Sequence, residues 1–508
     1  MFKTLANAWK IKELRSKLLV TLFIILLYRI GVAITVPFVD AELVAGSLQT
    51  QFDSGAVNGI LSFMNTLSGG AMASASLFAL GIQPYITASI VIQLLTVAIP
   101  ALERLSKQGE EGKKKITVIT RYITVAISLI MAIGYYFMIR YPENSLGFYA
   151  DIIPKENQTF YIAVVIIACY CAGAALVMWL GEKINEKGIG NGISIILFAN
   201  IVSRGSAIFM EYIQKIQYIF DGDPSIRSNA QMQGYYYELF GIGHLFDEKA
   251  YIESAKALVE NPWKYRVPAI LVMLLTTIGI LALIWFVVHI SDSERRIPVQ
   301  YAKKVVGRKM YGGRNTNLPI KVNMTGVMPV IFASSIISLP AMIFSFVNTK
   351  EGTFMNKIDL FFTGGGIAYS WTEIALTFIL IFAFAYFYVA ISFNPTEVAG
   401  NLQQNGGSIP GIRPGKPTAA FIQKVLSKVT LIGAIALSIV AVLPKLVYLL
   451  LNVIGTKAQL PGLMASYSMI SDYAQAGTSI IIVVGVILET VRELEAQMTM
   501  RHYKGFLD

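Results

Sequence analysis

Long, continuous apolar runs are the main feature of the hydropathy pattern along this chain. A run of about 20 apolar residues forms a helix that crosses a bilayer, whereas a membrane β-barrel needs alternating apolar and polar positions. We identify ten such runs and predict an all-α polytopic membrane protein with ten transmembrane helices. The predicted spans are Leu18–Val36, Ser76–Ile99, Ile116–Ile139, Phe160–Leu180, Gly192–Tyr212, Pro268–Ile290, Gly326–Val347, Trp371–Phe393, Val429–Leu451 and Tyr473–Leu488.

The segment Asn58–Pro100 departs from this pattern. Its first apolar piece, Ile60–Leu67, is too short to cross a bilayer, and the pair Gly69-Gly70 separates it from the full span that follows. Such a short piece is re-entrant or interfacial, and irregular backbone at membrane depth must be buried in protein or line a water-filled cavity. Two interpretations stay open from this segment alone: a loop that rests on the membrane surface, or a small movable element inside a cavity.

No soluble domain boundary is visible, and if the chain divides at all, it divides after the fifth span. Because five is odd, a repeat of the first half by the second would be inverted, a plan that transporters and channels use to enclose a central path. We therefore expect two inverted five-helix halves around a central pore. The predicted organisation is an N-terminal segment 1–17, an N-terminal half 18–212, a long external loop 213–267, a C-terminal half 268–491 and a tail 492–508.

Composition and charge support a helical membrane protein and orient it. The 508 residues are 55% hydrophobic and only 14% charged, with a mean hydropathy of +0.59. Most of the 42 Lys and Arg residues lie in the termini and in alternate loops. By the positive-inside rule both termini are cytoplasmic. In segment 1–17, Phe2, Leu5 and Trp9 lie roughly on one helical face among basic residues, which suits a helix at the membrane surface.

Two of the cytoplasmic loops, 291–325 and 394–428, are basic and longer than topology requires. Basic loops can simply set the orientation of the spans. Their length also favours a docking surface for a large or anionic partner.

Residue types that would support pumping or catalysis are scarce. The ionisable residues Arg29, Glu373, Lys445 and Glu489 lie toward predicted span ends, where snorkelling would suffice. An ion-coupled transporter would carry membrane-depth carboxylates or histidines, so a pump or symporter is not favoured. The stretch Gly411–Thr418 resembles part of a phosphate-binding loop but has proline where that motif needs glycine and Ser or Thr. We expect no nucleotide, metal or other cofactor and no catalytic residue.

Several stretches together resemble the SecY family, the channel subunits of the bacterial Sec protein-export translocon. The resemblance runs from Trp9 to about Gln497 and includes all ten spans in order; only the loop 213–267 is longer than expected for the family. The stretches are SLFALGIQPYITASIVIQLL (76–95), GEKINEKGIGNGISIILF (181–198), RRIPVQYAKK (295–304), PIKVNMTGVMPVIFASS (319–335), FNPTEVAGNLQQNGGSIPGIRPGKP (393–417) and GTSIIIVV (477–484).

The resemblance implies an hourglass channel closed by a ring of apolar side chains. The spacing is compatible, because residues four apart share one helix face, and an apolar constriction blocks water and ions by dewetting. Isoleucines in spans more often face lipid or other helices, and periodicity alone does not separate these alternatives. The implied ring residues are Ile82, Ile86, Ile193, Leu197, Ile331 and Ile482.

The resemblance also implies a plug at about residues 58–70 and a lateral gate between the second and seventh spans. Small polar residues permit close but separable helix packing, although ordinary packing would use them as well. The implied plug residues are Asn58, Gly59, Ile60, Leu61, Phe63, Met64, Asn65, Leu67, Gly69 and Gly70, and the gate residues are Ser89, Gln93, Ser334, Ser335 and Ser338.

In the family, the two long cytoplasmic loops contact the ribosome or the motor ATPase SecA. This implies docking residues Arg308 and Lys309 in the first loop and Arg413 and Lys416 in the second. The further implied partners are the SecE and SecG subunits, signal peptides, nascent polypeptides and membrane lipids, with no nucleotide bound by this chain.

We therefore expect a protein-conducting channel of the bacterial cytoplasmic (inner) membrane. It would translocate unfolded secretory polypeptides and release transmembrane helices into lipid through the lateral gate. One alternative is a small-molecule uniporter, which would need a compact polar pocket at the membrane midplane. A second is a membrane-embedded enzyme, which would need paired catalytic groups at depth; the spans contain neither pattern.

Overall fold

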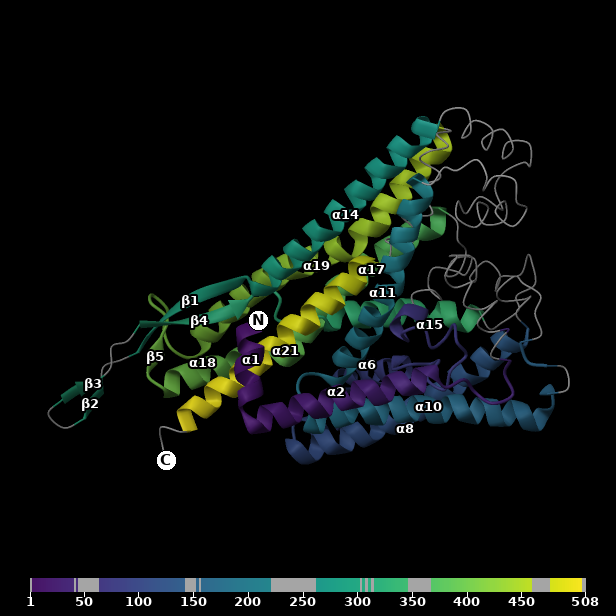
Figure 1. Ribbon diagram of the computed structural model, residues 1–508. Helices are drawn as coiled ribbons and strands as arrows, with labels where there is room; N and C mark the ends of the chain where they lie inside the picture. Colours follow the sequence, from purple (N-terminus) through teal and green to yellow (C-terminus); the bar gives the residue numbers. More distant parts are fainter. Residues whose placement is uncertain are drawn as a thin grey trace.

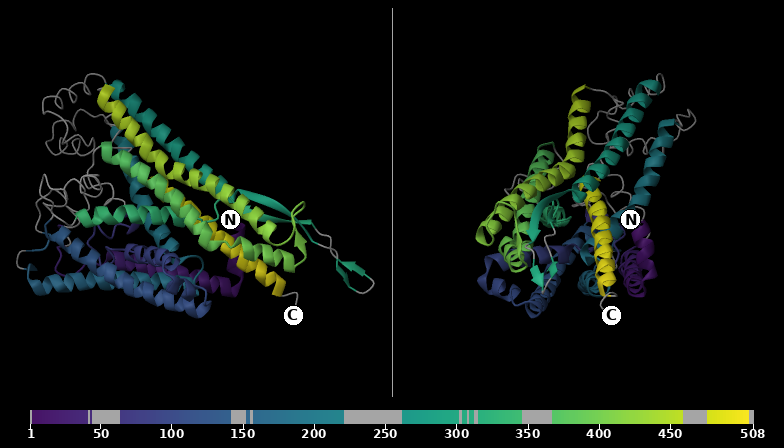
Figure 2. Two further views of the ribbon diagram at one scale, coloured as in Figure 1. Left: turned by 180° about the vertical axis from the view of Figure 1, so that it is seen from behind. Right: turned by 90° about the vertical axis from the view of Figure 1, so that its left-hand side faces the viewer.

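Helices make up most of the described part of the chain (Figures 1 and 2), which confirms the predicted all-α class. The computed structural model describes residues 2–40, 43, 64–141, 152–154, 157–220, 262–301, 304–306, 309–311, 315–345, 367–458 and 476–504. The predicted plug residues Asn58 to Phe63 and the docking residue Arg308 lie outside these ranges, as does most of the long loop 213–267.

The first group of helices is built around α2, α8 and α10, which lie side by side in Figure 1. The side chains of α8 and α10 pack on one another and on the turns 68–82 through a buried apolar cluster that includes Met131, Tyr135 and Tyr170. The helices of this group are α1 (Phe2–Lys10), α2 (Lys12–Ala33), α6 (Gln83–Ala98), α7 (Pro100–Ser106), α8 (Glu110–Arg140), α10 (Phe160–Lys187) and α11 (Gly192–Phe220).

Long helices that run diagonally in Figure 1 make up most of the second group, which also includes the shorter α15 and α18. Within it α17 packs on α19, and α21 packs on both α14 and α19. The helices are α14 (Pro262–Asp292), α15 (Met328–Ser345), α17 (Ile367–Ser392), α18 (Pro395–Gln404), α19 (Lys416–Ala458) and α21 (Ala476–Lys504).

The two predicted docking loops contain a small sheet, which the prediction of an all-α protein missed. Strand β1 (Glu294–Tyr301) pairs antiparallel with β4 (Asn315–Lys321) from its own loop and with β5 (Gly407–Ser408) from the other loop. The short strands β2 (Lys304–Val306) and β3 (Lys309–Tyr311) form a separate hairpin. Ile297, Val299 and Ile320 cover an apolar cluster shared with α19. The loops thus form one folded unit.

The second predicted span, Ser76–Ile99, is not one continuous helix, so its predicted N-terminal bound is wrong. Residues 68–82 form turns, Ser76 pairs with Thr35 in an isolated bridge, and α6 begins only at Gln83. Gly81 has a φ of +54°, a left-handed conformation that interrupts a helix and that glycine adopts readily. At its other end α6 meets α7 at an angle of 105°, where Pro100 begins the new helix.

All ten predicted spans overlap a helix, but the number of membrane crossings stays a prediction. Within the described residues, six helices are long and apolar enough to cross a membrane, or seven if the bent pair α6 and α7 counts as one span. The apolar parts of α11 and α15, Gly192–Gly205 and Met328–Leu339, are shorter.

The prediction that ionisable residues in spans merely snorkel is wrong for Arg29 and for the pair Glu373 and Lys445. The Arg29 guanidinium is half-buried and donates to the carbonyls of Gly69, at 3.3 Å, and Ala199, at 3.2 Å. Glu373 of α17 and Lys445 of α19 form an ion pair with side chains only 19% and 17% exposed. These charges are satisfied within the protein, as buried charges must be.

The N-terminal helix α1 packs on the C-terminal helix α21. Ala8 and Leu14 join Leu494 in a small buried cluster, and Thr4 Oγ1 donates to Glu495 at 3.1 Å. Ala8 and Leu14 of the N-terminal segment therefore pack against the C-terminal helix, while Trp9 is 45% exposed.

Candidate functional site

The six predicted ring residues come together in one apolar cluster. Four helices supply them: Ile86 lies in α6 and Ile82 caps its start, while α11, α15 and α21 provide the others. Ile193 packs against the cluster half-buried, and the other five are at most 2% exposed. Residues far apart in sequence thus converge where the two helix groups meet (Figure 1).

The elements that form the ring cluster approach one another closely. At Gly485 of α21 an added Cβ would lie 2.2 Å from Val327 Cγ2, just before α15, so this contact tolerates only glycine. The structure places Leu67, from the described end of the predicted plug, in the same apolar cluster as the predicted ring residues.

Residues 64–70, the described part of the predicted plug, form a short helical turn followed by the glycine pair. Asn65 is 1% exposed, and its Oδ1 accepts from the Ala73 amide at 2.9 Å. Gly69 and Gly70 have φ values of +73° and +88°, the left-handed region that favours glycine. At Gly69 an added Cβ would also lie 2.8 Å from Asn200 Oδ1. The glycine pair is thus required by backbone conformation and, at Gly69, by space.

Three side chains that the sequence analysis did not select contact this plug segment. Tyr28 and Arg29 come from α2, and Asn200 comes from α11. An amide inside an apolar run, as at Asn200, is a signal that sequence reasoning could have used. The roles of Tyr28 and Arg29 depend on the fold of the turns after the plug, which no local pattern reveals.

The predicted gate lies between α6 and α15, and the structure shows a hydrogen bond across it. Gln83 Nε2 donates to Ser338 Oγ at 3.1 Å. The predicted gate residues Ser89 and Gln93 do not make this contact: Gln93 Nε2 donates to Ser89 Oγ within α6 at 3.3 Å. Gln83 was missed because the second span was expected to continue as a helix through it.

Other polar groups in this α6–α15 seam are buried without a hydrogen-bond partner within the described part of the chain. They are Gln83 Oε1, Thr87 Oγ1 and Ser335 Oγ. Ser335 and Ser338 are at most 2% exposed, and Ser334 is half-buried. Each buried group without a partner costs about 1–3 kcal/mol, so the seam is less stable than an apolar one of the same shape. Because of this lower stability, less free energy is needed to separate α6 from α15.

The four predicted docking residues lie in different parts of the structure. Arg413 and Lys416 are exposed in the turn that leads into α19, where Thr418 Oγ1 donates to the Arg413 carbonyl at 2.8 Å. Lys309 lies in β3, and Arg308 is outside the described residues. Burial, followed by the nearby charge of Arg492, lowers the pKa of Lys321 in β4. Of the four predicted docking residues, Arg413 and Lys416 are thus the ones whose exposure the described structure shows.

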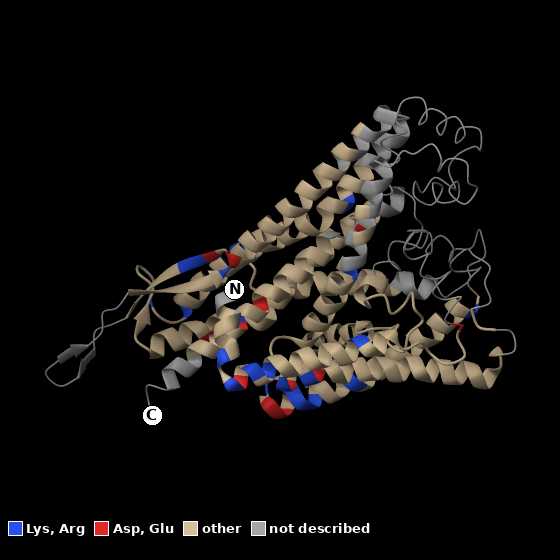
Figure 3. Cartoon of the chain, in the orientation of Figure 1, with Lys and Arg blue, Asp and Glu red and all other residues tan. Residues whose placement is uncertain are grey.

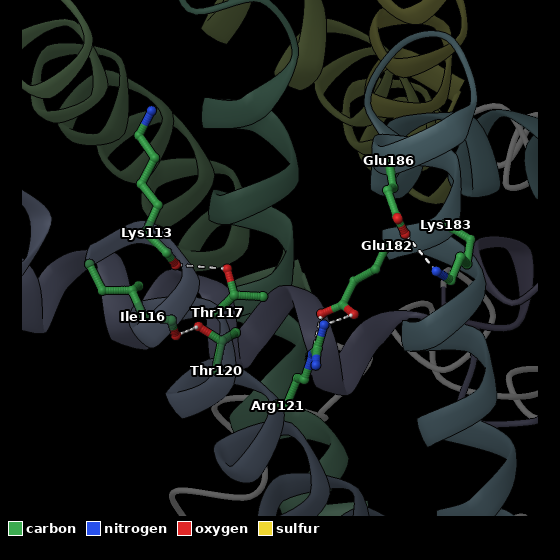
Figure 4. A network of polar contacts seen from close by, with 8 residues as sticks. All are labelled: Lys113, Ile116, Thr117, Thr120, Arg121, Glu182, Lys183 and Glu186. Carbon is green, nitrogen blue, oxygen red and sulfur yellow. Dashed lines mark hydrogen bonds and ion pairs between the residues drawn. The ribbon is translucent and has the colours of Figure 1, made fainter. Parts of the chain in front are cut away.

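A second group of cations lies at the neighbouring ends of α8 and α10 (Figures 3 and 4). Arg121 of α8 makes two contacts with Glu182 of α10, at 2.9 Å from Nε and 2.7 Å from Nη2. Lys183 pairs with Glu186 at 2.5 Å. Because both pairs are partly exposed, they add little stability. The Arg121–Glu182 pair joins the two helix ends, whereas the Lys183–Glu186 pair lies within α10.

Six or seven apolar helices of membrane-spanning length within the described residues define a polytopic helical membrane protein. The family model SecY matches residues 76–491. The chain is 39% identical over 513 residues to "Protein translocase subunit SecY" of Streptomyces coelicolor, with 100% of both chains covered. The chain belongs to the SecY family.

Two solved structures share this fold. One is a SecY structure concerned with a plug domain that stabilises the closed state of the translocation channel and maintains a membrane seal; the TM-score is 0.53 at 17% identity, over 95% of this chain and 92% of that one. The other is Sec61 in the canine ribosome-channel complex from the endoplasmic reticulum, with a TM-score of 0.50 at 16% identity, over 95% and 92%.

Membership of the family establishes the broad function. The chain is a protein-conducting translocation channel and a multi-pass protein of the cytoplasmic membrane. It is a translocase channel subunit and not a catalytic enzyme.

Proposed function

We propose that this chain conducts unfolded secretory polypeptides through the apolar ring and releases transmembrane helices sideways into lipid between α6 and α15. The observation that carries the proposal is that the six ring residues, five of them buried and Ile193 half-buried, gather in one cluster where α6, α11, α15 and α21 meet. A ring of flexible apolar side chains can widen around a passing chain and close again after it. In its closed state it excludes water and so blocks ions.

A seal is needed because the membrane stores energy as an ion gradient. An ion that leaks down 100 mV dissipates about 2.3 kcal/mol. We propose that residues 58–70 are the plug that reinforces the ring. The contact of Leu67 with the ring cluster supports this role.

The lateral gate in this proposal is the α6–α15 seam. Gln83 and Ser338 make its cross-helix hydrogen bond, and Ser334, Ser335 and Ser89 add small side chains beside it. Small residues let the helices pack closely, and few strong contacts must break when they part. A sufficiently apolar segment could then move from the pore into lipid.

We propose that both termini are cytoplasmic and that the halves 18–212 and 268–491 enclose the pore as inverted five-helix units. Lys and Arg gather at one end of α2, α8 and α10 and on the adjacent sheet (Figure 3). That asymmetry agrees with the positive-inside rule. The loop 213–267 would then be external.

The partners in this proposal dock on the sheet and on the turn with Arg413 and Lys416. The motor ATPase SecA and the ribosome both fit a cationic surface, since one offers acidic side chains and the other RNA phosphates. The relative in the canine complex is itself bound to a ribosome. SecE and SecG would cover apolar helix faces exposed to the membrane.

Site-specific photocrosslinking tests the proposal. A photoreactive apolar residue replaces Gln93 or Ser334 in turn, and a translocation intermediate with a radiolabelled signal sequence is stalled in the channel. A third variant carries the probe at Leu275, which is 56% exposed on α14, as a lipid-facing control. We expect adducts from Gln93 and Ser334 and none from Leu275. Equal labelling from all three positions would contradict a gate between α6 and α15.

A further inference from the structure

Three side chains hold three consecutive carbonyls at the end of the plug segment. Asn200 Nδ2 donates to the Leu67 carbonyl at 2.6 Å, the Tyr28 hydroxyl to the Ser68 carbonyl at 3.2 Å, and Arg29 Nη1 to the Gly69 carbonyl at 3.3 Å. Carbonyls at the end of a short helical turn lack intrahelical partners and need such donors. Side chains from two different helices supply them here.

The same side chains also connect these two helices to each other. Asn200 Nδ2 of α11 donates to the Tyr28 hydroxyl of α2 at 2.9 Å. Arg29 Nη2 of α2 donates to the Ala199 carbonyl of α11 at 3.2 Å. If α2 and α11 move apart, the donors cannot keep both sets of partners. Retention of the plug segment is therefore linked to the spacing of α2 and α11.

The turn after the glycine pair is held by α8 and α10 as well as by the plug segment, since Ser68 Oγ accepts from the Met72 amide at 3.2 Å. The Tyr135 hydroxyl of α8 donates to the Met72 carbonyl at 2.5 Å, and the Tyr170 hydroxyl of α10 donates to the Ala75 carbonyl at 3.4 Å. The glycine pair, with its left-handed φ values, lies between these contacts and those made by Tyr28, Arg29 and Asn200. When residues 67–69 are released, Met72 and Ala75 would still be held by α8 and α10.

Burial makes these contacts effective. Tyr28 and Asn200 are fully buried, and Ser68 is 4% exposed. A carbonyl that loses its donor here also lacks water, so release is costly unless the segment moves into the pore. The hydrogen bonding of this group is incomplete, since Asn200 Oδ1 has no donor within the described residues. The arrangement is thus strong enough to hold the segment and weak enough to release it.

We propose that Tyr28, Arg29 and Asn200 are positioning residues that keep the plug closed and release it when α2 and α11 separate. This inference rests on the proposed role of residues 58–70 as plug. It assigns to the first and fifth spans a part in gating that the ring and the α6–α15 seam do not describe. A passing chain that widens the ring at α11 would at the same time free the plug.

The test is the open fraction of the full channel complex reconstituted in planar bilayers without substrate. Tyr28→Phe removes one donor to the plug with little change of shape, and we expect the open fraction to rise about fivefold. Asn200→Leu removes two hydrogen bonds and should raise it further. Arg29→Met should also raise it, whereas Arg29→Lys, which keeps a donor, should restore most of the closure. The conductance of each open channel should stay unchanged, because the ring is intact.

Tyr135→Phe is the matched control, since it removes one hydroxyl-to-carbonyl hydrogen bond on the fixed side of the glycine pair. We expect no change in its open fraction. An equal rise in Tyr135→Phe would indicate general loosening and would overturn the inference, as would an unchanged open fraction in Tyr28→Phe. Tyr28→Phe keeps the test valid even if Asn200→Leu does not fold.

Deletion of residues 58–67 separates this inference from the proposal on which it rests. If the deletion raises the open fraction and the Tyr28 and Asn200 variants do not, the positioning role fails while the plug role stands. If the deletion leaves the open fraction unchanged, both fail.

Discussion

Replacing Gln83 by leucine should make the lateral gate harder to open. In the closed seam the Gln83 amide is 6% exposed, its Nε2 donates to Ser338 Oγ, and its Oε1 has no partner among the described residues. Leucine has nearly the same volume and carries no polar atom. Ser338 keeps a partner after the change, because its hydroxyl donates to the Ser335 carbonyl at 3.0 Å.

The net effect follows from two opposing contributions. Loss of the hydrogen bond costs the closed gate about 1 kcal/mol, whereas removal of an unpaired buried amide oxygen stabilises it by about 1–3 kcal/mol. When the gate opens, Gln83 faces the aqueous pore and leucine does not gain that hydration. We therefore expect Gln83→Leu to stabilise the closed gate by about 1 kcal/mol, which is about a fivefold shift in the opening equilibrium.

The assay is the membrane insertion of a series of signal segments of graded hydrophobicity. A closed gate that is more stable requires a more apolar segment to open it, so weakly apolar segments should insert about fivefold less in Gln83→Leu while strongly apolar ones insert normally. Gln423→Leu is the control, since Gln423 is exposed on α19 and belongs to neither helix of the seam, and it should behave as wild type. Greater insertion of weak segments in Gln83→Leu would refute the reasoning.

Three further outcomes are expected. Glycine at both Ile82 and Ile193 should open the ring and raise resting ion conductance in planar bilayers, and unchanged conductance would remove these residues from the seal. Arg413→Glu should reduce SecA-driven export strongly while thermal stability stays near wild type, because its side chain is exposed; normal export would exclude it from docking. Lys445→Met should destabilise the protein by about 3–5 kcal/mol in thermal unfolding because it leaves Glu373 unpaired, and adding Glu373→Gln should recover most of the loss.

Periodicity and the family resemblance together selected six residues that the structure brings together. Ile82 and Ile86 are four residues apart, as are Ile193 and Leu197, so each pair lies on one helix face, and the structure places all four in the same cluster. Such a spacing survives any error in helix bounds of a few residues. It does not depend on which other elements lie nearby.

Contacts that depend on irregular backbone could not be predicted in this way. Gln83 bonds Ser338 because α6 begins seven residues later than its apolar run suggests. Arg29 is held by two carbonyls, one of them in a glycine turn, although its position near a span end suggested snorkelling. Hydropathy reports whether a segment is apolar but not where its helix starts, so partners of this kind become visible only in the fold.

The sheet was missed for a similar reason. Strand β1 is mostly polar on its exposed positions, and its partner β5 lies more than a hundred residues away in another loop. The pairing of Gln300 with Ser408 has no local signal. Charge and loop length favoured a docking surface on these two loops. That the loops fold together is a tertiary property, which neither signal reveals.

The central claim is that a translocating polypeptide passes through the ring, and disulfide trapping tests it most directly. Single cysteines replace Ile86 and Ile331 in turn, with Leu275→Cys on α14 as the lipid-facing control and the native Cys169 and Cys171 changed to serine. A secretory chain with one cysteine in its mature part is stalled during export and oxidised. The account predicts disulfides from both ring positions and none from Leu275; a stalled chain that bonds to neither ring position would contradict it.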